Sequence, residues 1–276
     1  MSRSADIIPL REPAQPVTFS GLRAHQSQGA ELDYFIYVPR SATTNSPLLV
    51  TIHGIDRLAL QHAVRFSALA EKHGFIVLAP MFSKARIPRY QRLERGPHGD
   101  CPIATFELTV DHLQRATGLA AGPLRLFGYS GGAQFAMRYT LAGSLPVGRL
   151  VLAAPGWFTM PDTQHPFPYG LGDNSALEGR AMDLARLLSI PVLLTVGAED
   201  TRRDRSLNRN ALVESSQGKT RVERAHRWYG AITAVAKARG LPQMTQLKLL
   251  EGAGHDFDDN MQTFGLGEIA TDWLIN

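Results

Sequence analysis

A serine in a glycine-rich setting is the residue of this sequence best placed to do chemistry. Ser130 lies within Gly128–Gly132, a G-x-S-x-G pattern, directly after the apolar run Leu124–Phe127 and before the helix-forming segment Gly131–Leu141. In a sharp strand-to-helix turn, small flanking residues let strand and helix pack closely. The hydroxyl is then presented above a helix N-terminus, which favours developing negative charge. The pattern predicts a nucleophilic serine, and the alternative is an ordinary glycine-rich turn.

A serine hydroxyl needs a base to take its proton and an acid to orient that base. His255 follows the apolar run Leu247–Leu250, and Asp200 follows Val192–Val196. Each of the two therefore comes just after a predicted strand, and the order serine, aspartate, histidine is a known order of a catalytic triad. We expect Ser130 to attack an acyl carbon, His255 to act as general base, and Asp200 to orient the imidazole.

Bringing these residues together requires several strands that end at one edge of a sheet. Short apolar runs alternate with longer segments of helical period, which is typical of a sheet covered by helices. The predicted strands are Asp33–Val38, Leu48–Ile52, Phe75–Leu78, Leu124–Phe127, Leu150–Ala153, Val192–Val196 and Leu247–Leu250. The predicted helices are Arg57–Lys72, Thr105–Ala116, Gly131–Leu141, Ala176–Leu188, Thr220–Ala238 and Gln262–Leu274. The pattern predicts an α/β fold, with a mostly parallel, doubly wound sheet whose carboxyl edge carries the site.

The segments between these elements give the expected domain organisation. We expect one α/β domain over residues 1–276, with an N-terminal extension at 1–30. Met81–Pro102 and Gly156–Asn174 are long and irregular, and each follows a strand. Loops of this length are more often functional than idle, so a small loop-rich cap is expected at 156–188. Gly74 and Gly240 are expected to end helices, and Asp56 to begin one.

From about Leu32 to its end the chain resembles the α/β-hydrolase superfamily. Within it, Arg221–Gly240 is loosely similar to bacterial esterases and poly(hydroxyalkanoate)-depolymerase-like hydrolases. The resemblance favours Asp200 over its neighbour Glu199 as the acid, since the family's acid usually ends a G-x-x-D run.

The resemblance also implies an oxyanion hole. Its donors would be the backbone N–H groups of Ile55 and Gly131, and such donors are typically worth about 3 kcal/mol each. The chain has His53-Gly54-Ile55-Asp56 where many lipases have HGGG, so bulky tertiary-alcohol esters are less expected.

Aromatic residues and two basic runs could shape the substrate site. Tyr129, Trp157 and Phe158 are expected to line an acyl pocket, with burial as ordinary core as the alternative. Arginines and a lysine gather in two loops: Lys84, Arg86, Arg89, Arg92 and Arg95, and then Arg202, Arg203, Arg205 and Arg209. These runs could steer an anionic ester to the site, or form a solvated rim or a subunit contact.

Composition limits the remaining function classes. The chain has 276 residues, is 44% hydrophobic, and has 29 Lys and Arg against 25 Asp and Glu, for a net charge of +4. This mild excess does not indicate nucleic-acid binding. The single cysteine, Cys101, excludes an intrachain disulfide and a four-cysteine zinc site. The apolar run Ile7–Leu10 is too short for a signal peptide, and the sequence has no membrane-length apolar window, so we expect a cytoplasmic protein without a membrane partner.

Other motifs do not indicate a cofactor. Gly265–Ala270 fits a dinucleotide fingerprint, but it has no following strand. The sequence has no H-E-x-x-H motif, so we expect neither a cofactor nor a catalytic metal. His62, His73, His112 and His226 fall on predicted helices and are expected at the surface or its boundary.

The sequence therefore predicts a serine hydrolase acting on a small-molecule carboxylic ester. Amide or peptide cleavage and acyl transfer by the same triad are the alternatives within enzymology. A binding protein that keeps the fold without turnover is the remaining alternative. The sequence leaves the oligomeric state open.

Overall fold

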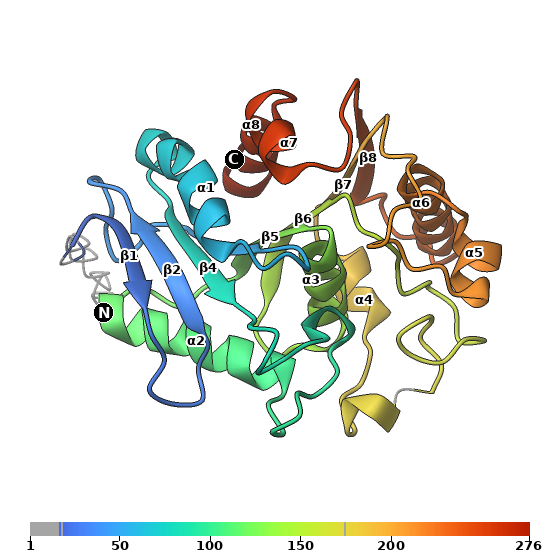
Figure 1. Cartoon of the computed structure of the whole chain (residues 1–276), viewed down its shortest axis with the longest axis horizontal. Helices are drawn as coiled ribbons and strands as arrows, with labels where there is room; N and C mark the ends of the chain where they lie inside the picture. The colour runs from blue at the N-terminus through green and yellow to red at the C-terminus, as the bar shows by residue number, and fades with distance from the viewer. Residues whose placement is uncertain (1–16, 18, 174) are drawn as a thin grey trace, which may run out of the picture.

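The computed structural model describes residues 17, 19–173 and 175–276, which build an eight-stranded sheet (Figure 1). The strands are β1 (Gly21–His25), β2 (Asp33–Val38), β3 (Leu48–Ile52), β4 (Ile76–Met81), β5 (Leu124–Tyr129), β6 (Val147–Ala153), β7 (Val192–Gly197) and β8 (Thr245–Leu250). Their order in the sheet is β1-β2-β4-β3-β5-β6-β7-β8. β2 runs antiparallel to both of its neighbours, and every pair from β4 to β8 is parallel. The predicted mostly parallel, doubly wound sheet is confirmed.

All seven predicted strands are present, and the sequence analysis missed only β1 among the strands described. β1 lies at the edge of the sheet and pairs with β2 alone. Its three central residues are exposed, so it has no apolar run to reveal it. Part of the expected N-terminal extension is therefore a strand of the sheet. The apolar run Ile7–Leu10 lies outside the described residues.

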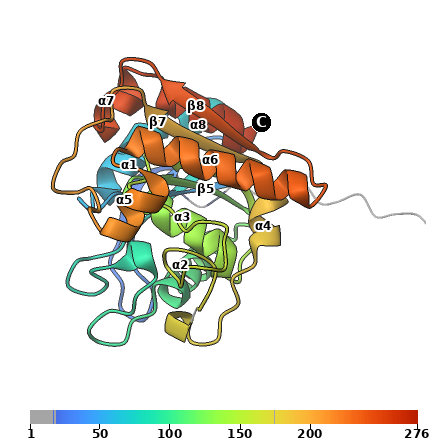
Figure 2. The same ribbon diagram turned by 90° about the vertical axis from the view of Figure 1, so that its right-hand side faces the viewer.

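Helices cover both faces of the sheet. They are α1 (Ala59–His73), α2 (Pro102–Thr117), α3 (Gly131–Ala142), α4 (Leu184–Leu188), α5 (Ala211–Gln217), α6 (Arg221–Ala238), α7 (Phe257–Gln262) and α8 (Leu266–Ile275). Figure 2 shows α6, α3 and α2 on the side turned to the viewer. Side chains of α2, α3 and α6 join one buried apolar cluster, and those of α1 and α8 join another.

The strands divide their side chains between these two clusters. In β3, Val50 and Ile52 belong to the first cluster and Leu49 to the second. In β6, Leu150 and Leu152 face the first cluster while Val151 and Ala153 face the second. Alternate residues point to opposite faces, so a strand buried on both sides must be apolar throughout.

Three helix predictions need correction, and backbone conformation explains two of them. The predicted helix Ala176–Leu188 is reduced to α4, because Glu178 and Gly179 have positive φ angles of 54° and 82°. The predicted helix Gln262–Leu274 is divided between α7 and α8 at Gly265, which has a φ of 70°. The third correction concerns Asp56, which does not begin α1: Leu58 holds the N-cap position.

Two further helix features complete the comparison. α5 was missed, and Asn210 begins it by accepting a hydrogen bond from the backbone N–H of Leu212 at 2.9 Å. Gly74 ends α1 in the left-handed conformation, as predicted.

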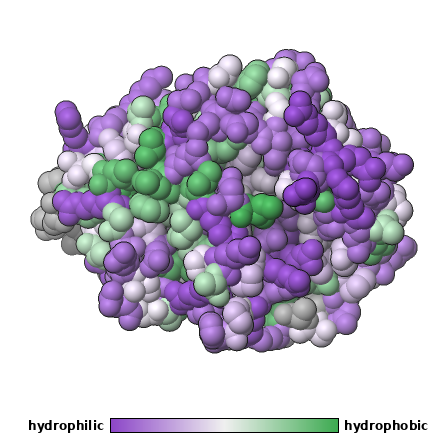
Figure 3. Space-filling model, in the orientation of Figure 1, coloured by the Kyte–Doolittle hydropathy of each residue, from purple (hydrophilic) through white to green (hydrophobic). Residues whose placement is uncertain are grey.

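One face of the molecule carries an apolar region among polar residues. Figure 3 shows hydrophobic residues gathered left of centre on this face, near the place where Figure 1 draws α1. Large exposed apolar side chains lie in and just before α1, at Ile55, Leu58, Leu60 and Val64. Within the described part of the chain, no helix combines the length and apolar character needed to cross a membrane.

Candidate active site

The turn between β5 and α3 holds Ser130 in a strained conformation. Its φ is 51°, a region that residues with a side chain rarely occupy. The turn is possible because glycines flank it. A Cβ on Gly128 would lie 2.4 Å from the carbonyl oxygen of Gly132, and one on Gly132 would lie 2.0 Å from that of Ile52. The glycines of the pattern thus allow the close approach that presents the hydroxyl above α3.

The structure brings Ser130, His255 and Asp200 into one hydrogen-bonded row. Nε2 of His255 lies 3.1 Å from Oγ of Ser130, and Nδ1 of the same ring lies 2.6 Å from Oδ2 of Asp200. When Nδ1 carries the proton and donates it to the carboxylate, Nε2 can accept the serine proton. Asp200 is buried, at 2% exposure, whereas Glu199 is exposed.

Two loops that follow neighbouring strands position the acid and the base. The loop after β7 carries Asp200, and the loop after β8 carries His255. The N–H of Glu199 donates to the carbonyl oxygen of Ala253 at 2.9 Å, which joins the loops directly. At Gly197 a Cβ would lie 2.2 Å from that same oxygen, so a side chain there would push the loops apart.

Arg221, the first residue of α6, holds the other oxygen of Asp200. Its Nη1 donates to Oδ1 of Asp200 at 3.1 Å and to Oδ2 of Asp204 at 3.2 Å. Its Nη2 donates to Oγ of Ser206 at 2.6 Å. Burial raises the pKa of Asp204, but hydrogen bonds from Ser206 and Arg221 outweigh this effect and hold the pKa below its usual range. The buried guanidinium is thus shared by two carboxylates.

Asn260, on α7, fixes the loop of His255 against the strand that carries the serine. Its Nδ2 donates to the hydroxyl oxygen of Tyr129 at 2.9 Å and to the carbonyl oxygens of Gly254 and Asp256 at 3.0 and 2.5 Å. The ring centroids of Tyr129 and His255 lie 5.7 Å apart. Burial raises the pKa of Tyr129, which keeps its hydroxyl neutral.

The sequence analysis missed Arg221 and Asn260 as site residues. Arg221 carried a weak signal, since an arginine directly after Thr220, the N-cap of α6, lies where a helix start disfavours a cation. Asn260 carried no comparable signal, because its role depends on contacts distant in sequence.

The turn after β3 lies beside the serine. A Cβ added to Gly131 would meet Cγ2 of Ile55 at 2.8 Å and its backbone nitrogen at 3.3 Å. The amides of Ile55 and Gly131 have no hydrogen-bond acceptor among the residues that the structure describes. They are therefore available to a ligand at Ser130.

His53 stabilises this turn as a neutral imidazole. Its Nδ1–H donates to the carbonyl oxygen of Gly54 at 2.7 Å, and its Nε2 accepts the N–H of Phe82 at 3.0 Å. Tyr90 donates from its hydroxyl to the carbonyl oxygen of His53 at 2.5 Å. Burial lowers the pKa of His53 to about 4. A neutral ring is also the form that can accept the N–H of Phe82.

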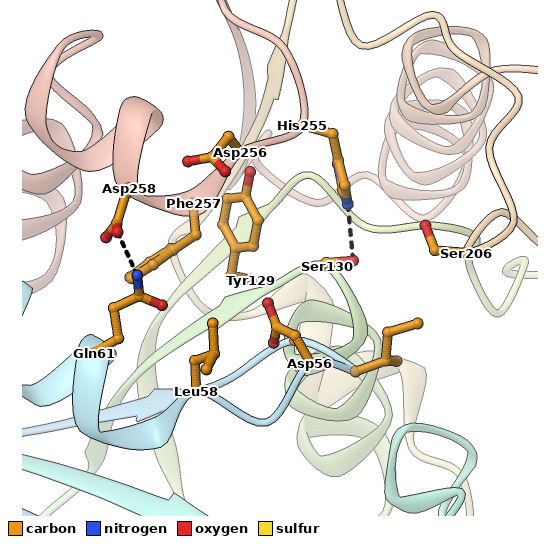
Figure 4. A pocket seen from close by; sticks show the side chains of 12 residues that line it. Asp56, Leu58, Gln61, Tyr129, Ser130, Ser206, His255, Asp256, Phe257 and Asp258 are labelled. Atoms are coloured by element: carbon orange, nitrogen blue, oxygen red, sulfur yellow. Dashed lines mark hydrogen bonds between the residues drawn. The ribbon is translucent and has the colours of Figure 1, made fainter.

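A cavity of about 220 Å³ opens beside Ser130 and His255 (Figure 4). Leu58, Tyr129 and Phe257 supply apolar surface. The charged side chains that line it are three aspartates, Asp56, Asp256 and Asp258. Asp258 is paired with Arg65 at 2.6 Å and also contacts Gln61.

Trp157 and Phe158 do not line this cavity, which corrects that part of the expected acyl pocket. Phe158 is fully buried and stacks on Trp228 with ring centroids 4.9 Å apart. Trp157 is 4% exposed. The guanidinium carbon of Arg138 lies over the Trp157 ring, 4.2 Å from the centroid of that ring. No residue described within 156–188 lines the cavity, so this loop-rich segment is not placed over the serine.

The basic runs are engaged largely in ion pairs. Five of the arginines have acidic partners: Arg86 with Asp100, Arg89 and Arg92 with Glu94, Arg95 with Glu178, and Arg203 with Glu214. Among the residues described, no lysine or arginine lines the cavity at Ser130.

The sheet order and the strained turn at the end of β5 define the fold: the chain is an α/β-hydrolase by fold. No family model matches the sequence, and no curated protein sequence does either. Solved structures, however, match along nearly the whole chain.

Three of these structures illustrate the similarity. Poly(aspartic acid) hydrolase-1 from Sphingomonas sp. KT-1 is 24% identical, with a TM-score of 0.76 over 93% of this chain and 99% of that one. A poly(3-hydroxybutyrate) depolymerase from Bordetella parapertussis is 25% identical, with a TM-score of 0.75 over 92% and 90%. An S-formylglutathione hydrolase from Agrobacterium tumefaciens is 15% identical, with a TM-score of 0.60 over 94% and 100%. The structural neighbours of this chain are thus hydrolases and esterases.

Proposed function

We propose that this protein is a serine hydrolase that cleaves carboxylic esters through an acyl-enzyme on Ser130. The observation that carries the proposal is the hydrogen-bonded row from Ser130 through His255 to Asp200, with distances of 3.1 and 2.6 Å. The row lies at the wall of an open cavity, where a substrate carbonyl can reach the hydroxyl.

In the proposed mechanism, His255 takes the proton of Ser130 as its oxygen attacks the acyl carbon. The imidazolium that forms is stabilised by Asp200. The amides of Ile55 and Gly131 donate to the oxyanion of the tetrahedral intermediate. His255 then gives its proton to the leaving alcohol, and in the second half it activates the water that releases the acid.

The cavity supports a small and neutral acyl group. A cavity of about 220 Å³ is below the usual range of about 300–1,000 Å³ for pockets of drug-sized ligands. Its lining aspartates and the ion-paired state of five loop arginines disfavour an anionic substrate. A short-chain neutral ester is therefore the substrate class we propose. One neighbour, 25% identical, is named for the depolymerisation of poly(3-hydroxybutyrate), itself a polyester.

Initial rates with p-nitrophenyl acetate, butyrate and octanoate test the proposal. Wild type should hydrolyse the short esters, and Ser130→Ala should lose at least about 10³-fold in kcat/KM. Ser67→Ala is the matched control, because Ser67 is a half-buried serine of α1 whose hydroxyl donates to the carbonyl oxygen of Val64 and which does not line the cavity. Equal rates for wild type and Ser130→Ala would contradict the proposal.

Matched p-nitroanilides and competing alcohols address amide cleavage and acyl transfer by the same residues. Faster turnover of the anilide than of the ester, or acyl transfer to the alcohol in preference to water, would favour these alternatives. Absence of turnover with every substrate would favour the binding-protein alternative.

A further inference from the structure

Three potential metal ligands meet at the edge of the sheet, outside the cavity at Ser130. His25 ends β1, Glu31 lies in the turn between β1 and β2, and His112 comes from α2. One ligand atom from each lies within 4.8 Å of the other two. The sequence analysis expected His112 at the surface or its boundary and did not single out His25.

The separation of one pair of ligand atoms suits coordination of a single ion, and the third residue lies near both. Nε2 of His25 lies 3.3 Å from Oε1 of Glu31, and the imidazole rings of His25 and His112 have centroids 4.4 Å apart. In a tetrahedral zinc site with bonds of about 2.0–2.2 Å, ligand atoms lie roughly 3.3–3.5 Å from one another. One pair already has this separation.

Tyr34 orients one of the two imidazoles. Its hydroxyl lies 3.1 Å from Nδ1 of His112, and its ring stacks on His25 with centroids 4.6 Å apart. When Nδ1 of His112 carries its proton and donates to the tyrosine oxygen, Nε2 presents its lone pair to an ion. A partner on the second ring nitrogen is the usual arrangement for a metal-bound histidine.

The turn that carries Glu31 is held in place from two sides. The N–H of Leu32 donates to Oγ1 of Thr109, on α2, at 2.8 Å. Arg86 donates to the carbonyl oxygens of Ala30 and Glu31 at 2.7 and 2.6 Å, and its charge is paired with Asp100 at 2.9 Å. These contacts hold the backbone of the turn, and the carboxylate is held as well, since its Oε1 accepts the N–H of Gln28 at 3.4 Å.

We propose that His25, Glu31 and His112 form a binding site for a divalent transition-metal ion, with Zn²⁺ as the first candidate. Two imidazoles and one carboxylate suit zinc and neighbouring metals better than Mg²⁺ or Ca²⁺, which prefer oxygen ligands. The ion joins the edge hairpin of β1 and β2 to α2, and water completes its coordination. None of the three residues lines the cavity at Ser130, so the role is structural.

Zinc binding to the full chain tests the site. After treatment with EDTA and removal of the chelator, wild type should bind one Zn²⁺ per chain in competition with a chromophoric chelator. The ion should raise Tm by roughly 3–6 °C. His25→Gln, Glu31→Gln and His112→Gln should each weaken binding by at least about tenfold and remove most of the Tm rise.

Two control variants separate this site from other histidines. His226→Gln, at an exposed position on α6, should bind zinc as wild type does. His255→Gln tests binding at the proposed triad and should also retain zinc. The proposal would be overturned if zinc still raised the Tm of all three ligand variants, or if the Tm rise were lost only in His255→Gln. Absence of zinc binding by wild type would overturn it as well.

A measurement on wild type keeps the test valid if a ligand variant fails to fold. X-ray absorption of the protein with one equivalent of Zn²⁺ should show imidazole scattering from two histidines at about 2.0–2.1 Å. A spectrum without two imidazoles in the coordination shell would contradict the site.

Discussion

Arg221 and Asp200 form a buried ion pair, with Nη1 of the guanidinium 3.1 Å from Oδ1 of the carboxylate and both side chains 1% exposed. The other carboxylate oxygen, Oδ2, accepts from His255 at 2.6 Å. Because each oxygen has its own charged or polar partner, the carboxylate cannot rotate without losing a hydrogen bond. The arginine thereby fixes the orientation of the Asp200 carboxylate.

Replacing Arg221 by Met should lower kcat/KM about 10–100-fold, because a hydrogen bond to a charged group is worth about 1.5–3 kcal/mol. The measurement is kcat/KM at a single neutral pH for wild type and Arg221→Met with the same short-chain ester, together with the Tm of each protein.

Arg224 provides the matched control for this prediction. It is also buried on α6, but it donates to the carbonyl oxygens of Gly218, Gly156 and Asn208 at 2.9, 2.6 and 2.7 Å. Arg224→Met should reduce stability and leave kcat/KM of the folded protein close to the wild-type value. Equal losses of kcat/KM in both variants would show that Arg221 acts through general packing rather than through Asp200.

The backbone at Ser130 predicts an order of stability between two inactive variants. At a φ of 51°, a residue without a side chain is relieved of strain. Ser130→Gly should therefore be more stable than Ser130→Ala by about 1 kcal/mol, a difference of roughly 2–4 °C in Tm. Thermal unfolding of the two purified variants measures this difference. A more stable alanine variant would argue against strain at the turn.

The two buried histidines predict a loss of stability in mild acid. Burial lowers the pKa of His53 from its ordinary 6.5 to about 4, and it lowers that of His62 well below 6.5. At pH values between about 4 and 6.5 the unfolded chain therefore binds more protons than the folded chain. The free energy of unfolding falls as the pH falls from about 6.5 toward 4. His53 alone should account for about 2 kcal/mol between pH 7.5 and pH 5.

Urea unfolding at these two pH values checks the prediction. His53→Gln should show a smaller pH-dependent loss than wild type, whereas His226→Gln, at an exposed position, should show the full loss. An unchanged loss in His53→Gln would mean that the buried ring is not the titrating group.

Apolar periodicity predicted most of the fold, because buried strands and the helices that cover them are apolar on the faces that they turn toward the core. β1 was missed because an exposed edge strand needs no apolar run. The helix predicted over Ala176–Leu188 failed at Glu178 and Gly179, where positive φ angles override the apolar period. His62, expected near the surface, is buried and stacks on Phe257 with centroids 3.8 Å apart.

Local sequence was sufficient to predict that Ser130, Asp200 and His255 lie together, since each follows the end of a strand. Their catalytic roles stay a prediction. Local sequence was insufficient for contacts between distant segments. Trp157 was expected at the cavity but packs beneath Arg138, and Arg221 reaches Asp200 from another element. Such contacts depend on how α3 and α6 lie on the sheet, which apolar spacing alone does not specify.

The small cavity predicts a preference that one substitution should change. Wild type should have a higher kcat/KM for p-nitrophenyl acetate or butyrate than for the octanoate. Leu58, 46% exposed, is one of the apolar side chains that line the cavity wall. Leu58→Ala should raise the ratio of kcat/KM for the octanoate to kcat/KM for the acetate several-fold, which corresponds to a change of about 1 kcal/mol in relative transition-state free energy. Leu241→Ala, at an exposed position outside the cavity, should leave the ratio unchanged.

Labelling with a fluorophosphonate, followed by peptide mass mapping, tests most directly whether Ser130 is an activated nucleophile. Wild type should acquire one phosphonyl group, located on Ser130, and an excess of short-chain ester should slow its formation. Ser130→Ala should stay unlabelled, and Asp200→Asn should label far more slowly because its imidazole is no longer oriented and charge-stabilised. A label on another residue, or ester hydrolysis by wild type without any label at Ser130, would contradict the proposed catalytic role.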